Sequence, residues 1–157
     1  MTRILVADPL EASGLDILRA AGAEVHLVSA AERARLPELV ADVDALVVRS
    51  ATNVTRALLE SANRLRVVGR AGVGVDNVDV EAATERGVLV VNAPTGNLVS
   101  ATEHTFALLL AVARSVPAAD ASMKRGEWDR KRFVGLELQG KTLGVVGLGR
   151  IGQRVAS

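Results

Sequence analysis

Short apolar runs alternate with amphipathic stretches along roughly the first hundred residues of the chain. The apolar runs are rich in valine and predict five β-strands, at residues 3–7, 24–28, 44–48, 66–69 and 88–91. The stretches between them have helical spacing and predict helices at 10–21, 32–41, 55–62 and 79–86. Asp79 is an expected N-cap, and Gly22 and Gly87 are expected C-caps. This alternation, with short connections, indicates an α/β fold built on a doubly wound parallel sheet.

A turn-rich segment, Asn-Ala-Pro-Thr-Gly-Asn at residues 92–97, marks a domain boundary. It predicts a first domain over residues 1–97 and a second segment over 98–157. Ser100 and Glu103 have the spacing of a capping box at the start of a helix. Residues 105–116 are apolar on nearly every side, so we expect this helix to be buried between domains or subunits, with Pro117 interrupting it.

A glycine motif, Gly-Leu-Gly-Arg-Ile-Gly at residues 147–152, lies near the end of the chain. An apolar run at 142–146 predicts a strand before it, and a helical pattern begins at Ile151. Strand, glycine turn and helix start form the context in which this motif binds a dinucleotide, because the amides at the helix start face the pyrophosphate. The acidic residue expected about 20 residues further on does not follow. The segment therefore predicts the truncated start of a Rossmann NAD-binding domain, with an incomplete NAD site.

Composition excludes several classes of function. The 19 basic and 18 acidic residues give a net charge of +1, without the basic patch typical of nucleic-acid binding. The absence of cysteine excludes disulfides and thiol catalysis, and only two histidines argue against a metal site. No apolar run reaches the roughly 18 residues of a membrane span, and the N-terminus lacks a signal-peptide pattern. We expect a cytoplasmic protein with neither nucleic acid nor membrane as a partner.

Polar residues follow the predicted strands at the edge where open parallel sheets bind ligands. Arg49 and Ser50 follow the third strand, and Arg70 with the loop 72–74 follows the fourth. Arginine binds carboxylate or phosphate with two parallel hydrogen bonds, and the free amides of a glycine loop donate hydrogen bonds to an anion. The pattern predicts a site for a small ligand with two negative charges. The alternative is that both arginines are ordinary surface charges.

Three other features carry weaker signals. His104 follows Glu103, but adjacent helix positions do not face each other, so we interpret it as structural, as we do His26 within a strand. Residues 124–133 contain five cations together with Trp128 and Phe133. The aromatic residues favour a subunit contact or an anion-binding loop. The alternative is a solvated loop.

Several segments, taken in order, resemble those of the D-isomer-specific 2-hydroxyacid dehydrogenase family. They are residues 48–52, 69–78, 92–97, 101–104 and 140–152. The Ala-Gly-Val-Gly, Glu-His and glycine motifs are shared across this family. The sequences Val-Arg-Ser-Ala-Thr at 48–52 and Trp-Asp-Arg-Lys-Arg-Phe at 128–133 are more specific to its phosphoglycerate dehydrogenase branch.

The resemblance implies a flavodoxin-like substrate domain and NAD-dependent oxidation of 3-phosphoglycerate to 3-phosphohydroxypyruvate, the entry step of L-serine biosynthesis. It further implies a homodimer or homotetramer. The substrate-binding residues that it implies are Arg49, Ser50 and Arg70 for the phosphorylated end, the Val73 and Gly74 amides for the carboxylate, Asn97, and Arg130 reaching the site of a neighbouring subunit. The residues that it implies for the NAD pyrophosphate are Gly147, Gly149, Arg150, Ile151 and Gly152.

Family members carry a catalytic arginine, glutamate and histidine beyond the cofactor motif, and no residue of this chain matches them. The resemblance therefore implies an N-terminal half that is inactive alone. Two alternatives stay open. One is another D-2-hydroxyacid dehydrogenase, acting on glyoxylate, lactate or a similar acid. The other is a non-catalytic anion-binding or oligomerisation module.

Overall fold

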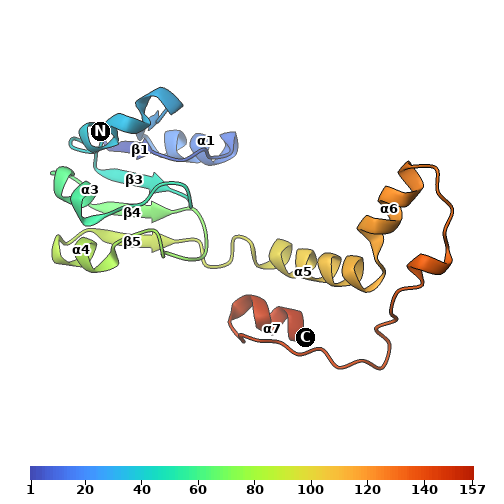
Figure 1. Cartoon of the computed structure of the whole chain (residues 1–157). Helices are drawn as coiled ribbons and strands as arrows, with labels where there is room; N and C mark the ends of the chain where they lie inside the picture. Colours follow the sequence, from blue (N-terminus) through green and yellow to red (C-terminus); the bar gives the residue numbers. More distant parts are fainter. The chain divides into compact units, whose positions relative to one another are not determined.

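The computed structural model describes all 157 residues, which form two compact units, Met1–Gly96 and Asn97–Ser157 (Figure 1). The first unit contains a five-stranded sheet in the order β2-β1-β3-β4-β5, and all its strand pairs are parallel. Its strands are β1 (Arg3–Val6), β2 (Glu24–Leu27), β3 (Ala45–Val48), β4 (Val67–Arg70) and β5 (Leu89–Asn92). The α/β fold with a doubly wound parallel sheet is confirmed, and this strand order is that of flavodoxin-like sheets.

The helices of the first unit are α1 (Ala12–Ala20), the 3₁₀ helix η1 (Ala30–Arg35), α2 (Leu36–Leu39), α3 (Arg56–Ser61) and α4 (Val80–Glu85). The helix expected at 32–41 is two short elements instead. Pro37 lies in the first turn of α2, where it cannot donate to the preceding turn, so a continuous α-helix does not form. Asp79 accepts a hydrogen bond from the Ala82 amide as the N-cap of α4, as predicted. Gly87, after α4, has the left-handed φ expected of a C-cap, +67°.

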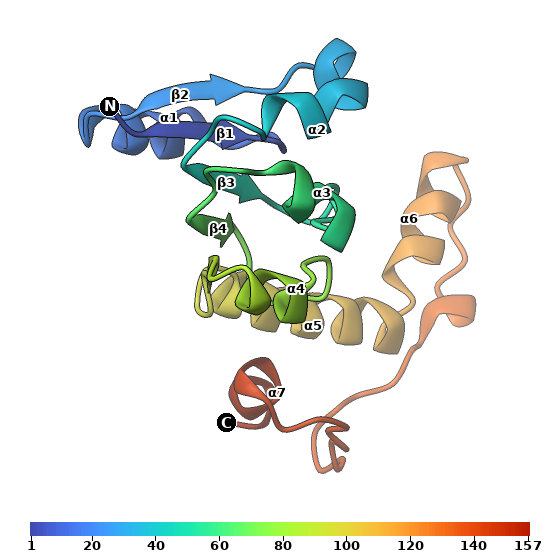
Figure 2. The same ribbon diagram turned by 90° about the vertical axis from the view of Figure 1, so that its left-hand side faces the viewer.

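Helices cover the two faces of this sheet unevenly (Figure 2). On one face, α3 and α4 pack Leu58, Leu59 and Ala82 against Leu46 and Val68 of the central strands. On the other face, α1 covers β1 and β3. The side chains of β5 that face the same way, Leu89 and Val91, are 62% and 44% exposed. The central strands are therefore buried, whereas one face of the β5 edge is open to solvent.

The second unit contains α5 (Leu98–Ala113), α6 (Val116–Lys124), the 3₁₀ helix η2 (Lys131–Phe133) and α7 (Arg150–Ala156). The break between α5 and α6 falls at Ser115, which has a left-handed φ of 53°. Pro117 lies in the first turn of α6, where a missing N–H breaks no helical hydrogen bond. No single helix has the length and apolar character needed to cross a membrane. Together α5 and α6 have both, but they are bent by 64°.

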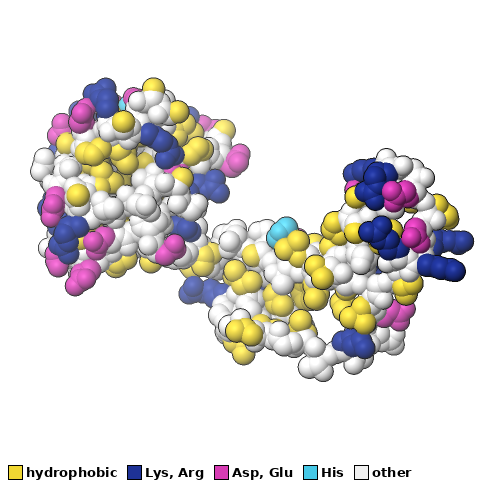
Figure 3. Space-filling model, in the orientation of Figure 1, with side chains coloured by type: hydrophobic (Ala, Val, Ile, Leu, Met, Phe, Trp, Pro, Cys, Tyr) yellow, Lys and Arg dark blue, Asp and Glu magenta, His cyan; other side chains and the backbone are white.

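None of the residues of α5 is buried within the chain, and several of its large apolar side chains are exposed, among them Phe106, Leu108, Leu110 and Val112. The burial of this helix between domains or subunits stays a prediction. Figure 3 shows apolar side chains gathered on the surface of this unit. The capping box is absent because the helix begins earlier, with Asn97 as its N-cap. The Ser100 hydroxyl donates to the Asn97 carbonyl.

The predicted strand at 142–146 is also wrong. These residues belong to no strand, although they lead directly into the glycine turn. A strand is stable only when a neighbour satisfies its backbone groups, and the second unit contains no other strand. Val146 is fully exposed as a result.

We predict rapid amide exchange over residues 142–148 and slow exchange in β1, β3 and β4. The amides of 142–148 donate no backbone hydrogen bond, whereas the central strands are paired on both sides. Hydrogen exchange followed by NMR on monomeric protein measures this directly. Protection over 142–148 equal to that of β3 would contradict it.

Candidate functional site

The carboxyl edge of the first sheet collects the polar residues that follow each strand. Arg49 and Ser50 come directly after β3, and Arg70 is the last residue of β4. The strand register aligns Val48, Arg70 and Asn92 across neighbouring strands, so Arg49 lies one residue beyond the neighbour of Arg70. The structure thus brings Arg49, Ser50, Arg70 and the glycine loop to one edge. Open parallel sheets bind their ligands outside this edge.

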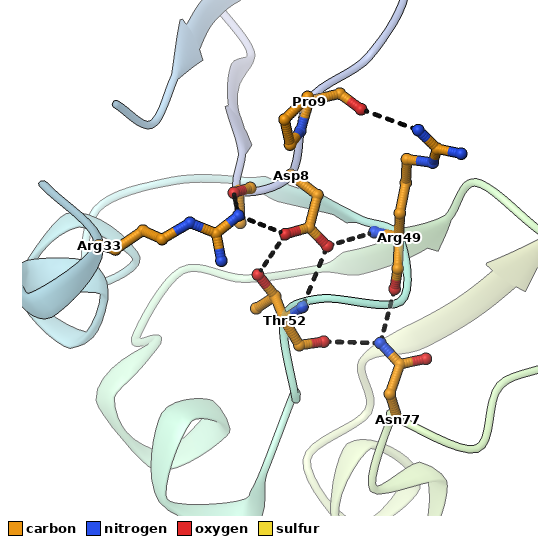
Figure 4. Close-up of polar contacts among 7 residues, drawn as sticks. Asp8, Pro9, Arg33, Arg49, Thr52 and Asn77 are labelled. Carbon is orange, nitrogen blue, oxygen red and sulfur yellow. Dashed lines mark hydrogen bonds and ion pairs between the residues drawn. The ribbon is translucent and has the colours of Figure 1, made fainter. Parts of the chain in front are cut away.

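Asp8 is the buried centre of this edge, with 1% of its surface exposed. It follows β1, the strand beside β3, and its carboxylate accepts four hydrogen bonds (Figure 4). The Arg33 guanidinium (2.8 Å) and the Thr52 hydroxyl (2.7 Å) donate to Oδ1. The amides of Arg49 (2.7 Å) and Thr52 (3.1 Å) donate to Oδ2. One carboxylate therefore holds both ends of the turn that carries Arg49 and Ser50.

The Asp8 carboxyl stays ionised in spite of its burial. Burial alone raises its pKa, but the hydrogen bonds from the Arg49 amide, the Thr52 hydroxyl, Arg33 and the Thr52 amide outweigh that effect. The net result is a pKa below the ordinary value, because all four donors stabilise the charged form. The charge at this position is thus maintained by the fold.

Asn77 holds the same turn from the other side. Its Nδ2 donates to the carbonyls of Arg49 and Thr52, each at 2.6 Å. The amides of these two residues bind Asp8 and their carbonyls bind Asn77, so the main-chain polar groups at both ends of the turn are satisfied. The Asn77 Oδ1 atom is buried without a partner. The Arg49–Thr52 turn is therefore fixed before any ligand arrives.

The Arg49 side chain is left without an acidic partner. Its Nη1 lies 3.4 Å from the Pro9 carbonyl, and it makes no ion pair. Figure 4 shows its guanidinium and that of Arg33 on different sides of Asp8. Because Arg33 takes the Asp8 charge, the exposed Arg49 guanidinium keeps donors for an anion.

Arg70 is half-buried and rests against the glycine loop. A Cβ added at Gly72 would collide with Arg70 Nη1, so the arginine occupies space that only glycine leaves free. Arg70 Nε is buried without a hydrogen-bond partner. A buried unpaired donor is costly, which marks this guanidinium as one that gains from binding an acceptor.

The glycine loop contributes fewer free amides than the sequence indicates. The Gly72 amide donates to the Arg70 carbonyl (2.8 Å), which takes it out of the expected anion nest. The Val73 and Gly74 amides donate no hydrogen bond within the chain. The Asn92 side chain holds the loop by donating to the Val73 carbonyl at 2.6 Å. The two amides that the sequence assigns to a carboxylate are thus available.

The second unit holds the glycine motif in the geometry of a phosphate-binding turn. Gly147 has a φ of +96°, and Gly149 is the N-cap of α7, with Arg150 and Ile151 in its first turn. A Cβ at Gly152 would collide with the Gly147 carbonyl, so the third glycine permits close packing of the turn on the helix. These residues fit a dinucleotide pyrophosphate. The strand that precedes such a turn in a complete site is not formed.

The loop after α6 forms a small cavity of its own. About 210 Å³ is enclosed by α6 and the segment that carries Trp128, Arg130 and Phe133. The Arg130 guanidinium lies 5.9 Å from the Trp128 ring centre, and Glu127 accepts from Arg125 and from the buried Ser122. Trp128 is nevertheless 71% exposed. The loop is ordered by its own contacts and presents its aromatic face to solvent.

Asn97 and Arg130 belong to the second unit, and their part in a substrate site stays a prediction. The two histidines lie on helix and strand surfaces. His26 pairs with Glu32 at 3.2 Å, and His104 is exposed on α5. Glu103 makes no capping bond because Asn97 begins the helix.

A cavity of about 940 Å³ lies at the opposite, amino-terminal edge of the sheet. Its charged groups serve the chain itself, since Arg64 pairs with Asp44 at 3.3 Å and Arg86 donates to the Ala62 carbonyl at the end of α3. Volume alone therefore does not mark the functional edge. Chemistry and sheet topology favour the carboxyl edge.

Sequence reasoning missed Asp8, Arg33, Thr52 and Asn77. Asp8 follows β1 and would have been found by extending the strand-end scan to the first strand. Thr52 carried a weaker signal, as part of the 48–52 segment. Arg33 lies 25 residues from Asp8, and Asn77 lies 25 residues from Thr52 and 28 from Arg49, and no local pattern indicates such pairs.

We predict that Asp8→Ala lowers the free energy of unfolding of the first unit by roughly 2–4 kcal/mol, because it leaves buried donors unpaired. In the wild type this contribution is present above about pH 4 and is lost as the pH falls through the lowered pKa of Asp8. Urea unfolding followed by the NMR peaks of β1 and β3 measures it. Aromatic absorbance or fluorescence would not report on the first unit, because all three aromatic residues lie in the second unit.

The control for this prediction is Asp16→Ala, which removes an exposed carboxylate paired with Arg19 at 3.3 Å. It should change the free energy of unfolding by less than about 0.5 kcal/mol. Equal losses in the two variants would show that Asp8 does not hold the edge together.

Comparison with known proteins identifies the family. The family described as "D-isomer specific 2-hydroxyacid dehydrogenase, catalytic domain" matches residues 4–146. The D-3-phosphoglycerate dehydrogenase of Methanocaldococcus jannaschii is 58% identical over 155 residues, covering 99% of this chain and 29% of that protein. The enzyme of the same name from Rattus norvegicus is 50% identical over 157 residues, 100% of this chain and 30% of that protein. The chain thus spans less than a third of the length of these relatives.

Solved structures agree with this assignment. The TT0316 protein of Thermus thermophilus superposes with a TM-score of 0.87 and 42% identity, over 99% of this chain and 51% of that one. The NAD-dependent formate dehydrogenase of Staphylococcus aureus, solved in complex with NAD, gives a TM-score of 0.83 and 30% identity, over 99% of this chain and 52% of that one. The chain belongs to the D-isomer-specific 2-hydroxyacid dehydrogenase family.

Proposed function

We propose that this chain supplies the substrate-binding part of an NAD-dependent D-3-phosphoglycerate dehydrogenase. The proposed reaction oxidises 3-phosphoglycerate to 3-phosphohydroxypyruvate, the entry step of L-serine biosynthesis. The single observation that carries the proposal is the pair of arginines at the carboxyl edge of the sheet. Arg49 has no acidic partner, and Arg70 has a buried, unpaired Nε. The names of the curated relatives support the same substrate.

The resemblance to phosphoglycerate dehydrogenases gives each residue a role that its chemistry supports. Arg49, Ser50 and Arg70 bind the phosphate, because guanidinium groups match its oxygens with paired hydrogen bonds. The free Val73 and Gly74 amides bind the carboxylate. Anchoring both ends of a small acid fixes the carbon between them in one orientation, and such orientation supplies much of the rate of bimolecular chemistry.

When bound, NAD would supply the acceptor for a hydride from the substrate carbon that carries the hydroxyl. In this chain Gly147, Gly149, Arg150, Ile151 and Gly152 would hold its pyrophosphate. The chain contains no residue that matches the family's proton-accepting histidine, so the hydroxyl proton has no assigned acceptor here. We therefore propose that the chain binds ligand but does not turn it over alone.

Assembly and location are proposed on narrower grounds. The exposed apolar side chains of α5 and the aromatic loop at 127–134 favour a homodimer or homotetramer, in which Arg130 reaches a neighbouring subunit's site. Asn97, at the start of α5, is proposed to contribute to the substrate side. The cytoplasmic location, and the absence of nucleic-acid and membrane partners, stay predictions from the sequence.

Two alternatives differ in class. A dehydrogenase of a smaller acid is compatible with the family, and a glyoxylate/hydroxypyruvate reductase of Sinorhizobium meliloti superposes with a TM-score of 0.83 at 31% identity. Two unpaired arginine groups exceed what a single carboxylate needs. A non-catalytic anion-binding or oligomerisation module is the second alternative. Turnover measured on a protein that joins this chain to the remaining part of a family member would distinguish it from the proposal.

We predict that 3-phosphoglycerate binds the first unit with a dissociation constant near the millimolar range, which corresponds to a binding free energy of about 4 kcal/mol. An NMR titration should shift the amide peaks of residues 49–51 and 70–75, and added salt should weaken the binding. Arg49→Ala and Arg70→Ala should each abolish these shifts. Arg35→Ala, which removes an exposed arginine paired with Glu38, is the matched control and should bind like the wild type. Equal shifts in all four proteins would mean that both arginines are plain surface charges.

We also predict no NAD reduction by the purified 157-residue chain with 3-phosphoglycerate. A missing acid–base group alone costs on the order of a hundredfold or more in rate. The measurement is the absorbance of NADH, with protein purified through a tag from a host that lacks its own enzyme of this activity. Turnover above the level of a mock purification would refute the prediction.

A further inference from the structure

The hydrogen-bond partners of the Asp8 carboxylate are unexpected. It lies beside Arg49, yet it binds the Arg49 amide at 2.7 Å and leaves that residue's guanidinium free. Its charge is paired instead with Arg33, which reaches it from η1 at 2.8 Å. The Arg33 side chain is 43% exposed, whereas the carboxylate is buried. A buried acid and a cation from a separate element thus fix the end of β3 and leave the Arg49 guanidinium exposed.

We propose that Asp8 is a positioning residue for the anion site, and that Arg33 is the counter-ion that keeps Asp8 from capturing the Arg49 guanidinium. Asp8 fixes the turn that carries Arg49 and Ser50 through the amides of Arg49 and Thr52. Arg33 neutralises Asp8, so Arg49 remains available to a phosphate. The inference rests on the proposed function, because it concerns the same anion site.

The positioning role and simple charge repulsion predict changes of opposite sign in the anion affinity when the charge of Asp8 is removed. A negative charge beside an anion site weakens anion binding by Coulomb repulsion, so removing it should strengthen binding. If Asp8 acts by holding the turn, Asp8→Asn should weaken binding instead. In the wild type all four donors face a carboxylate oxygen. Asparagine replaces one of the two oxygens by an NH₂ group, which is itself a donor, so these contacts cannot all be kept. The direction of the change therefore separates positioning from charge.

Arg33 provides a second, milder variant. Arg33→Met removes the counter-ion but leaves the carboxylate and all its other hydrogen bonds in place. Asp8 then competes with the ligand for Arg49. Arg33→Lys restores the charge and should rescue binding. Arg35→Met is the matched control, because it removes a charge from the same 3₁₀ helix but from a pair with Glu38 that lies away from Asp8.

The experiment is an NMR titration of the full 157-residue chain with inorganic phosphate and with 3-phosphoglycerate. We expect binding weakened about fivefold in Asp8→Asn and in Arg33→Met. Arg33→Lys and Arg35→Met should stay within about twofold of the wild type. In the free protein, the amide proton peaks of Arg49 and Thr52 should move upfield in Asp8→Asn, because they lose a charged acceptor. Those peaks should keep their positions in Arg35→Met.

The outcomes distinguish the inference from the proposed function. If Arg49→Ala and Arg70→Ala bind like the wild type, the anion site itself is refuted. If those two variants lose binding while Asp8→Asn binds as tightly as the wild type or more tightly, only the positioning role is refuted. Should Asp8→Asn fail to fold by its NMR spectrum, Arg33→Met decides. Unchanged binding in folded Arg33→Met, or the same loss in Arg35→Met, would overturn the role of the counter-ion.

Discussion

A buried negative charge organises the first unit, since Asp8 joins the end of β1 to the end of β3 where these strands lie side by side. Burying an ion is expensive, and it is tolerated here only because Arg33, two amides and a hydroxyl all face the carboxylate. The same contacts dictate where the main chain turns after β3. The joining of β1 to β3 and the placement of Arg49 thus both depend on the hydrogen bonds of one buried carboxylate.

The sheet could be predicted from the sequence because its information is local. Parallel strands buried on both faces are continuous apolar runs, and the residue after each run lies at the ligand edge whatever the strand order. The positions of Arg49 and Arg70 at this edge were predicted in this way. Asp8 obeys the same rule, but a single acid after a strand gives no hint of the four donors that it collects. The contacts of Arg33 and Asn77 depend on how distant loops fold back onto the edge of the sheet, and the periodicity of the sequence does not predict this.

The second unit shows the limits of local patterns. Residues 142–146 have the composition of a strand, but a strand exists only in a pair, and the neighbour is not specified by the segment itself. The apolar sequence of α5 indicates burial, yet burial is a property of what surrounds a helix. In the first unit the strands pair one another's backbone groups, and helices cover the apolar side chains of the central strands. In the second unit a Cβ at Gly152 would overlap the Gly147 carbonyl, so the close approach within the glycine turn depends on two residues that are near in sequence.

The contact between Gly72 and the Arg70 guanidinium shows how a residue without a side chain can direct a charge. A Cβ at position 72 would overlap Arg70 Nη1 as it now lies. Because that nitrogen is the flexible end of a long side chain, a larger residue at position 72 would displace the guanidinium and would not exclude arginine from position 70. Gly72 therefore controls where this positive charge lies at the edge of the sheet. A substitution there would redirect the charge while leaving the net charge of the edge unchanged.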